Sequence, residues 1–212
     1  MKVSRFHFNM LPVNTYILWD TDSRECAIVD AGCFYPKEEE ALSKFIADNR
    51  LTVKYLLATH LHFDHCFGNA FVAQKYGIGL SASKDDEFLL QNMSEQCRSF
   101  GIPFHGAVQP IGQYICDNDR FRLGNEELTA IAVPGHSPGS MAFYAPESGF
   151  VLSGDALFQM SIGRTDLPGG NYHQLIQSIQ KKLLTLPDDT IVYAGHGPET
   201  EIGIERTENP FL

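Results

Sequence analysis

The sequence predicts an α/β protein in which two β-sheets pack together and helices cover their outer surfaces. Two observations support this fold class. Short apolar strands and amphipathic helices succeed one another twice, once in each half of the chain. The chain has 212 residues, of which 43% are hydrophobic, so it can bury a sizeable core. Because no linker rich in Gly, Ser or Pro divides it, we expect residues 1–212 to form a single domain.

The first half should begin with strands and then alternate strands with helices. A helix is expected over residues 36–46, because Pro36 and the acids after it are typical of a first helical turn. Residues 53–58 are apolar almost throughout, as expected of a strand covered on both faces. Three earlier strands are expected at residues 3–8, 15–19 and 26–30.

Two helices and an unpatterned segment should follow that strand. One helix is expected over residues 66–76, ended by Gly77, and another begins at Ser83, whose hydroxyl suits a helix cap. Residues 98–115 are interrupted by glycine and proline, and we interpret them as a loop over one face that could act as a lid.

Strands return in the second half. A glycine-containing loop is expected at residues 161–170, followed by a helix from about Tyr172 to Leu184. The expected strands are residues 120–123, 128–133, 141–145, 149–153 and 191–194.

Composition limits the classes of partner. A net charge of −10 argues against nucleic acid, because phosphate binding rewards Lys and Arg. No apolar run approaches the roughly 18 residues of a membrane span, and the N-terminus does not resemble a secretory signal. Five scattered cysteines without a Cys-x-x-Cys pair are typical of reduced thiols. We therefore expect a cytoplasmic protein with no membrane or nucleic-acid partner; no pattern indicates its oligomeric state.

The most informative stretch is residues 58–65, which contains three histidines and one aspartate. In an extended segment, residues two apart point to the same side, so His60 and His62 can reach one cation. Asp64 and His65, past the bend, would face a second position beside it. Imidazole and carboxylate ligands suit zinc, iron or manganese. A His-x-His pair alone could equally be a surface pair, so further ligands are needed.

Three further candidates, His136, Asp155 and His196, each follow a predicted strand and a glycine. Loops at strand ends often carry chemistry, and glycine lets the backbone turn so that a short side chain points into a shared cleft. Seven ligands fit two adjacent cations. The first would be held by His60, His62 and His136, and the second by Asp64, His65 and His196, with Asp155 bridging them.

The pattern Thr-His-x-His-x-Asp-His, followed by a distant His, Asp and His, resembles the metal-site signature of the metallo-β-lactamase superfamily. The match covers almost the whole chain, and all seven positions are present. The resemblance implies a four-layered αββα sandwich with the site at one edge. It also implies two divalent metal ions, with zinc expected first and iron or manganese as alternatives.

Two downstream segments, residues 161–170 and 195–211, resemble short single-domain bacterial glyoxalase II-like hydrolases. This resemblance implies hydroxyacylglutathione hydrolase activity, in which a small-molecule thioester such as S-lactoylglutathione is cleaved by a metal-bridged hydroxide. It implies that Asp64 is both a ligand and a catalytic group that orients the hydroxide.

The resemblance also suggests a substrate-binding role for Arg164. It stands nine residues after Asp155, where two-domain glyoxalase II enzymes carry a substrate-binding lysine. The alternative is an ion pair with Asp166 that only shapes the loop. Pro198 stands where those enzymes have a tyrosine, and we expect no C-terminal helical glutathione-binding domain. The thiol part of the substrate could therefore be a thiol other than glutathione.

Two other functions are alternatives to thioester hydrolysis. Iron-dependent persulfide dioxygenases of the same superfamily share the histidine motif and a similar Gly-Arg-Thr-Asp loop. They usually continue the last histidine with Asp-Tyr, whereas this chain has Gly197 and Pro198. A non-catalytic metal-binding protein would be expected to lack a ligand, and none is missing. The sequence therefore favours a metal-dependent thioester hydrolase.

Overall fold

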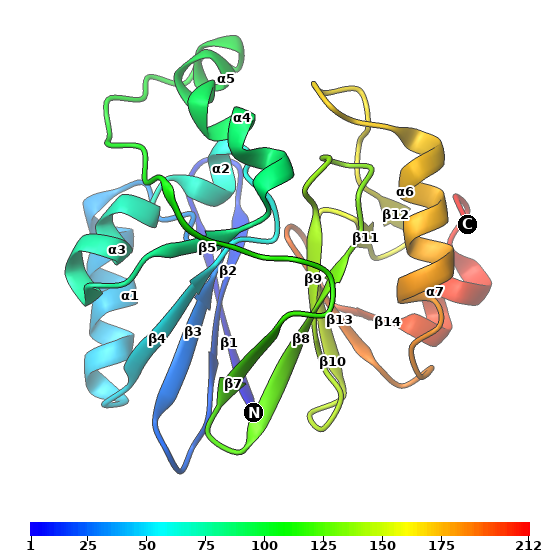
Figure 1. The fold of residues 1–212 in the computed structure, drawn as a ribbon, viewed down its shortest axis with the longest axis horizontal. Coiled ribbons are helices and arrows are strands. Elements are labelled where there is room, and N and C mark those ends of the chain that lie inside the picture. The colour runs from blue at the N-terminus through cyan, green and yellow to red at the C-terminus, as the bar shows by residue number, and fades with distance from the viewer.

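The structure is a computed structural model that describes residues 1–212. Two six-stranded sheets form its centre, with the strand orders β1-β2-β3-β4-β5-β6 and β14-β13-β10-β9-β8-β7. Helices α1 and α3 lie outside the first sheet and α6 and α7 outside the second, which gives four layers (Figure 1). The predicted αββα sandwich is confirmed.

The bounds of the elements are as follows. The first sheet contains β1 (Lys2–Phe8), β2 (Val13–Trp19), β3 (Glu25–Val29), β4 (Thr52–Leu57), β5 (Leu80–Ala82) and β6 (Ile111–Tyr114). The second contains β7 (Arg120–Leu123), β8 (Glu126–Ala132), β9 (Met141–Ala145), β10 (Phe150–Gly154), β13 (Ile191–Ala194) and β14 (Thr200–Glu201), and a small hairpin joins β11 (Leu157–Phe158) to β12 (Ser161–Ile162). The helices are α1 (Pro36–Asp48), α2 (Phe63–Cys66), α3 (Asn69–Tyr76), α4 (Glu87–Gln91), α5 (Met93–Ser99), α6 (Tyr172–Ser178) and α7 (Ile202–Glu208).

Alternation of side chains along the strands creates these layers. In β2, Tyr16 and Leu18 face the second sheet and share a buried cluster with Phe143 of β9. Their neighbour Ile17 points the other way, into the core beneath the helices of the first sheet. In β10, Val151 likewise packs with the residues of α6. Strands such as β2 and β10 are therefore covered on both faces, which explains their continuous apolar sequence.

The directions of the strands gather several strand ends at one end of the sandwich. β3 runs parallel to β4, and β10 runs parallel to β13. The segments that follow β4, β8, β10 and β13 carry all seven proposed metal ligands. This end lies beside α2, toward the top of Figure 1. None of the helices combines the length and hydropathy needed to cross a membrane.

The helix expected over residues 66–76 is two helices in the structure. α2 begins earlier, at Phe63, and α3 begins at Asn69, so the helix is broken around Gly68. The Gly68 N–H donates to the carbonyl of Ala31 (2.7 Å), and a Cβ at Gly68 would lie 2.2 Å from Cys33 Sγ. This close contact with the segment after β3 turns the chain away from the helical path.

The prediction of a loop over residues 98–115 is wrong at both ends of that range. α5 continues to Ser99, and residues 111–114 form β6 at the edge of the first sheet. Three of the four β6 residues are exposed, so the strand lacks an apolar pattern. The short strands β5 and β14 were also missed, because two or three residues cannot display an alternation, and α7 was not expected.

Candidate metal centre

The structure brings all seven predicted ligands together at one end of the sandwich. His60 and His62 lie in the irregular segment between β4 and α2, and Asp64 and His65 belong to α2. The remaining three come from the second sheet: His136 lies between β8 and β9, Asp155 directly follows β10, and His196 follows β13. The centre therefore lies between the two sheets and draws side chains from both.

One cluster consists of His60, His62 and His136. One nitrogen of each ring lies within 4.8 Å of the others, and Nδ1 of His62 lies 2.8 Å from Nε2 of His136. Burial, reinforced by His136, lowers the pKa of His62 to about 3. Burial also lowers the pKa of His60 well below its ordinary value. The imidazoles of His60 and His62 therefore stay neutral near pH 7, which is the form that binds a metal.

The second cluster consists of Asp64, His65 and His196. Nε2 of His196 lies 3.2 Å from Oδ2 of Asp64 and 3.3 Å from Nε2 of His65. Burial alone would lower the pKa of His65, but the carboxylates of Asp64, Asp155 and Asp30 raise it to about 10. Three carboxylates thus surround His65 in this half of the centre, and their negative charge attracts cations.

Asp155 lies between the two clusters. Its Oδ2 is 3.7 Å from Nε2 of both His136 and His196, and its Oδ1 is 3.5 Å from Nε2 of His65. Oδ1 is buried without a hydrogen-bond partner, as is Nε2 of His60. Buried polar atoms without partners are rare in folded proteins. A divalent cation in each cluster would satisfy these atoms, and the nitrogen and oxygen donors fit such ions.

Hydrogen bonds on the outer side fix three of the imidazole rings. Nδ1 of His65 lies 3.0 Å from Asp30 Oδ2, and Nδ1 of His136 lies 2.8 Å from the carbonyl oxygen of Arg164. The Thr59 hydroxyl donates to Asp30 (2.6 Å) and can accept from Nδ1 of His60 (3.1 Å). Each ring that donates through Nδ1 turns the lone pair of Nε2 toward the centre.

Asp30 is a buried residue beside the centre that the sequence analysis did not identify. It directly follows β3 and is 1% exposed. Besides contacting His65, its carboxylate accepts hydrogen bonds from the Thr59 backbone N–H (2.7 Å) and hydroxyl. Asp30 forms a further group of possible ligand atoms with His60 and His65, but Thr59 and His65 already occupy both oxygens of its carboxylate. A polar residue directly after an apolar strand was the signal that identified Asp155, and it could have identified Asp30.

Asp86, just before α4, is a second missed residue. Its buried carboxylate accepts hydrogen bonds from the Leu61 N–H (3.1 Å), the Ser137 hydroxyl (2.7 Å) and the Gly139 N–H (2.6 Å). Leu61 lies between His60 and His62, and Ser137 directly follows His136. Asp86 therefore ties together the two segments that supply the three-histidine cluster. Its sequence context, a helix start rich in acids, indicates only a cap.

Two of the glycines before the ligands are required by close packing. A Cβ at Gly195 would lie 2.1 Å from Oδ1 of Asp155 and 2.8 Å from Cε1 of His65. Gly154 has a φ of +53°, and a Cβ there would lie 2.5 Å from the Thr59 hydroxyl. Any side chain at either position would push the ligands apart.

Arg164 lies on the wall of the cleft above the centre. This cleft has a volume of about 230 Å³, and Leu11, Phe63, Phe100 and Leu167 form its apolar walls. The guanidinium of Arg164 contacts Asp166 through two hydrogen bonds of 2.7 Å each, from Nε and Nη2. The loop-shaping ion pair is therefore present, and Nη1 remains available on a side chain that is 53% exposed.

Comparison with known sequences agrees with this geometry. The sequence profile of the metallo-beta-lactamase superfamily matches residues 9–196. The hydroxyacylglutathione hydrolase GloC of Haemophilus influenzae is 39% identical over 200 residues, which are 94% of this chain and 92% of that protein. The probable metallo-hydrolase YqgX of Bacillus subtilis is 36% identical over 212 residues, covering 100% of this chain and 98% of that protein. The chain belongs to the metallo-beta-lactamase superfamily.

Solved structures show the same fold. The B3 metallo-beta-lactamase BLEG-1 superposes with a TM-score of 0.89 at 35% identity, covering 100% of this chain and 99% of that one. TTHA1623 in a di-iron-bound form superposes with a TM-score of 0.86 at 32% identity, covering 99% of this chain and 100% of that one. ETHE1 from Myxococcus xanthus superposes with a TM-score of 0.79 at 26% identity, covering 99% of this chain and 84% of that one. Within this superfamily, the two ligand clusters define a site suited to two metal ions.

Proposed function

We propose that this chain is a metal-dependent hydrolase that cleaves a thioester such as S-lactoylglutathione. The observation that carries the proposal is the position of Asp155 between two complete ligand clusters at the base of a cleft. The similarity to GloC over nearly the whole chain supports the choice of a thioester. The donor set favours zinc, with iron and manganese as alternatives. The unpaired cysteines, four of them buried, support a cytoplasmic location.

The residues of the chain would divide the work as follows. One cation would be held by His60, His62 and His136. The other would be held by Asp64, His65 and His196. Asp155 would contribute to both positions. When bound, the cations supply Lewis-acid chemistry: they polarise the thioester carbonyl and lower the pKa of water.

The cleft residues would position water and substrate. Asp64, which lines the cleft, can orient the attacking water by accepting a hydrogen bond from it. Leu11, Phe63 and Phe100 would exclude bulk water, and Nη1 of Arg164 can donate to a substrate oxygen.

The direct test is release of thiol by purified, metal-loaded protein. S-lactoylglutathione and thioesters of an uncharged thiol should each release one thiol for each ester bond cleaved, with no consumption of oxygen. Nitrocefin belongs in the same assay, because one structural neighbour bears the name B3 metallo-beta-lactamase. Turnover of nitrocefin without cleavage of any thioester would overturn the proposal.

The second candidate is an iron-dependent persulfide dioxygenase of the same superfamily. Its single iron would need only part of the donor set, whereas here both clusters are complete and share Asp155. The same assay separates the two functions, because a dioxygenase would consume oxygen in the presence of glutathione persulfide.

A further inference from the structure

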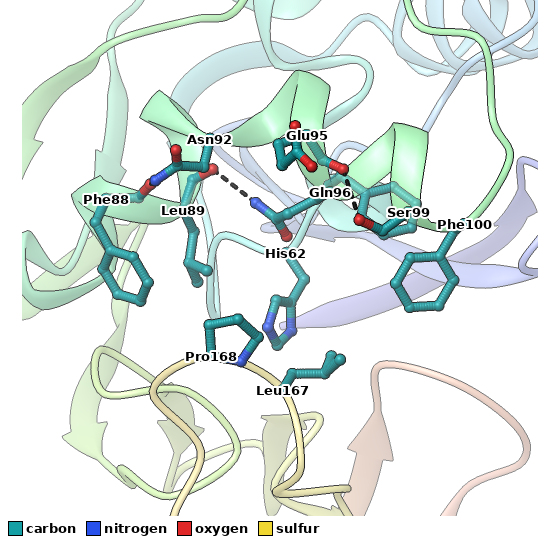
Figure 2. Close-up of a pocket in the computed structure, with 11 residues that line it drawn as sticks. His62, Phe88, Leu89, Asn92, Glu95, Gln96, Ser99, Phe100, Leu167 and Pro168 are labelled. Carbon is teal, nitrogen blue, oxygen red and sulfur yellow. Dashed lines mark hydrogen bonds between the residues drawn. The ribbon is translucent and has the colours of Figure 1, made fainter.

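A second cavity adjoins the cleft above the metal centre. This side pocket has a volume of about 250 Å³ and shares His62, Phe63, Phe100 and Leu167 with the cleft. α4 and α5 form one wall, and Leu167 and Pro168 face them across the pocket (Figure 2). Because His62 borders both spaces, a molecule that reacts at the metal centre can extend directly into the side pocket.

The walls of the side pocket are mainly apolar. They are formed by Phe63, Phe88, Leu89, Phe100, Leu167 and Pro168. The volume is below the roughly 300–1,000 Å³ typical of sites that enclose a whole drug-sized ligand, so it suits one part of a substrate.

Hydrogen bonds within α4 and α5 occupy much of the polar lining. The amides of Asn92 and Gln96 donate to the backbone carbonyls of Phe88 (2.8 Å) and Leu89 (2.6 Å). The Ser99 hydroxyl donates to the Glu95 carbonyl (3.0 Å), and two of these hydrogen bonds are marked as dashed lines in Figure 2. The carboxylate of Glu95 forms an ion pair with Arg98. Asn92, Gln96 and Ser99 thus each spend one donor on the helices, and none of them carries a positive charge that could pair with a carboxylate.

The charges around the two spaces do not match glutathione. A glutathionyl group carries two carboxylates, yet no lysine or arginine lines the side pocket. Apart from the proposed metal ions, the cleft has one arginine and no lysine, and the charge of that arginine, Arg164, is already compensated by Asp166. Moving a carboxylate from water into an apolar space without a partner is costly, whereas burying an alkyl group there is favourable.

We propose that the side pocket receives an uncharged apolar substituent of the thioester substrate. The preferred substrates are then esters that carry an alkyl or aryl group on the acyl or the thiol side, in preference to S-lactoylglutathione. This inference rests on the proposed thioester hydrolysis, because it names the substrate class of the same site.

The first experiment measures binding without turnover. Titration calorimetry of the metal-loaded protein would use S-methyl, S-butyl and S-hexyl thioethers of N-acetylcysteamine, which cannot be hydrolysed. Affinity should rise by about fourfold for each methylene until the pocket is full. S-hexylglutathione should bind no more tightly than the S-hexyl derivative of N-acetylcysteamine.

A matched pair of variants locates the effect. Ser99 lines the pocket and is exposed, so Ser99→Trp fills the space without disturbing the core. Ser94 is exposed on the same helix but does not line the pocket, and Ser94→Trp is the control. In Ser99→Trp, the affinity for the thioethers should no longer rise with the length of their alkyl group. Ser94→Trp should bind the thioethers like the unmodified protein. Equal affinity for the methyl and hexyl compounds, or a gain that survives in Ser99→Trp, would overturn the proposal.

Hydrolysis assays then identify the side of the ester. A series of acyl groups on N-acetylcysteamine tests the acyl side, and acetyl esters of thiols of increasing length test the thiol side; a gain in kcat/KM in either series supports the pocket. If S-lactoylglutathione is the best substrate and neither series shows a gain, the hydrolase stands and this inference fails. If no thioester is cleaved but thioether binding remains sensitive to Ser99→Trp, the hydrolase fails and the pocket assignment stands.

Discussion

Asp155 differs from the other six proposed ligands because it faces both clusters. Its two oxygens lie 3.5–3.7 Å from ring nitrogens of His65, His136 and His196. A cation bound in either cluster would therefore lie beside this carboxylate. Loss of Asp155 should therefore weaken both positions, whereas loss of a histidine should weaken mainly one.

Substitution of Asp155 tests this bridging role. Asp155→Ala should reduce the metal content well below two ions per chain. Activity should fall by more than the roughly 10–100-fold that loss of an outer hydrogen-bond partner costs. Elemental analysis and thiol release measure the two effects, with Asp22→Ala at an exposed turn as the control. Two ions per chain in Asp155→Ala would refute the bridging role.

Arg164 can be tested separately from the metal centre. Its backbone carbonyl contacts His136, and its side chain contacts Asp166, so Arg164→Ala should leave the metal content unchanged. Losing a charged donor to the substrate should raise KM by roughly tenfold with little change in kcat. Asp166→Ala, which releases the guanidinium, should lower KM for anionic glutathione esters. An unchanged KM in both variants would leave Arg164 with only a loop-shaping role.

At the residue scale, the sequence could predict the candidate ligands but not their supports. The ligands could be found because histidines and aspartates in metal-like spacing follow strand signals. Asp30 and Asp86 act through residues 35 and 51 positions away, His65 and Ser137. No local pattern shows which buried carboxylate will meet which distant loop, so these contacts required the fold.

At the scale of elements, Asp86 couples the start of α4 to the metal centre. Asp86 is the last residue of a short 3-10 helix, Lys84–Asp86, that leads into α4. This helix is capped by Ser83, whose hydroxyl accepts a hydrogen bond from the Asp85 N–H (3.3 Å). α4 also supplies Phe88 and Leu89 to the side pocket. Asp86 and α4 therefore fix the chain segments that carry His60, His62 and His136, and they also form part of the wall of the side pocket.

Asp86→Asn should destabilise this arrangement. The carboxylate accepts from three donors, and an amide would turn an N–H toward at least one of them, which costs about 1–3 kcal/mol. Urea unfolding should show this loss, and metal affinity should fall as well. Asp85→Asn, at an exposed position one residue earlier, is the control. Stability and metal affinity equal to those of the control would contradict the coupling.

Helices and strands could be predicted where the hydrophobic residues follow a clear helical or strand period. They could not be predicted where contacts with distant residues determine the local structure. α1 has acids in its first turn and an apolar face, and it forms as expected. The break at Gly68 depends on contact with Ala31 and Cys33, which lie far away in the sequence. β6 is a strand because its backbone pairs with β5, although most of its side chains are exposed.

At the scale of the whole molecule, the metal centre joins the two sheets. His60, His62, Asp64 and His65 come from the segment after β4 of the first sheet, and His136, Asp155 and His196 come from the second. Each proposed cation has ligands from both sheets. Metal binding should therefore stabilise the packing of one half of the sandwich against the other.

Removal of the metal should lower the melting temperature. At a free metal concentration of 1,000 times Kd, one bound ion stabilises the folded state by about 4 kcal/mol. For a chain of this size that corresponds to a change in Tm of roughly 10 °C. Calorimetry before and after chelation, with restoration by added zinc, would measure it. Asp155→Ala should show a much smaller change, and equal Tm values with and without metal in the unmodified protein would contradict the link between the sheets.

The central claim is a two-metal hydrolytic centre, and the most direct measurement is the number of metal ions per chain in the active protein. Elemental analysis of metal-loaded samples would be paired with thiol release from a thioester in the same preparation. Two ions per chain, with activity that rises as the second position fills, is the predicted result. A single iron per chain, with oxygen consumed in the presence of a persulfide and no thiol released from any thioester, would contradict it.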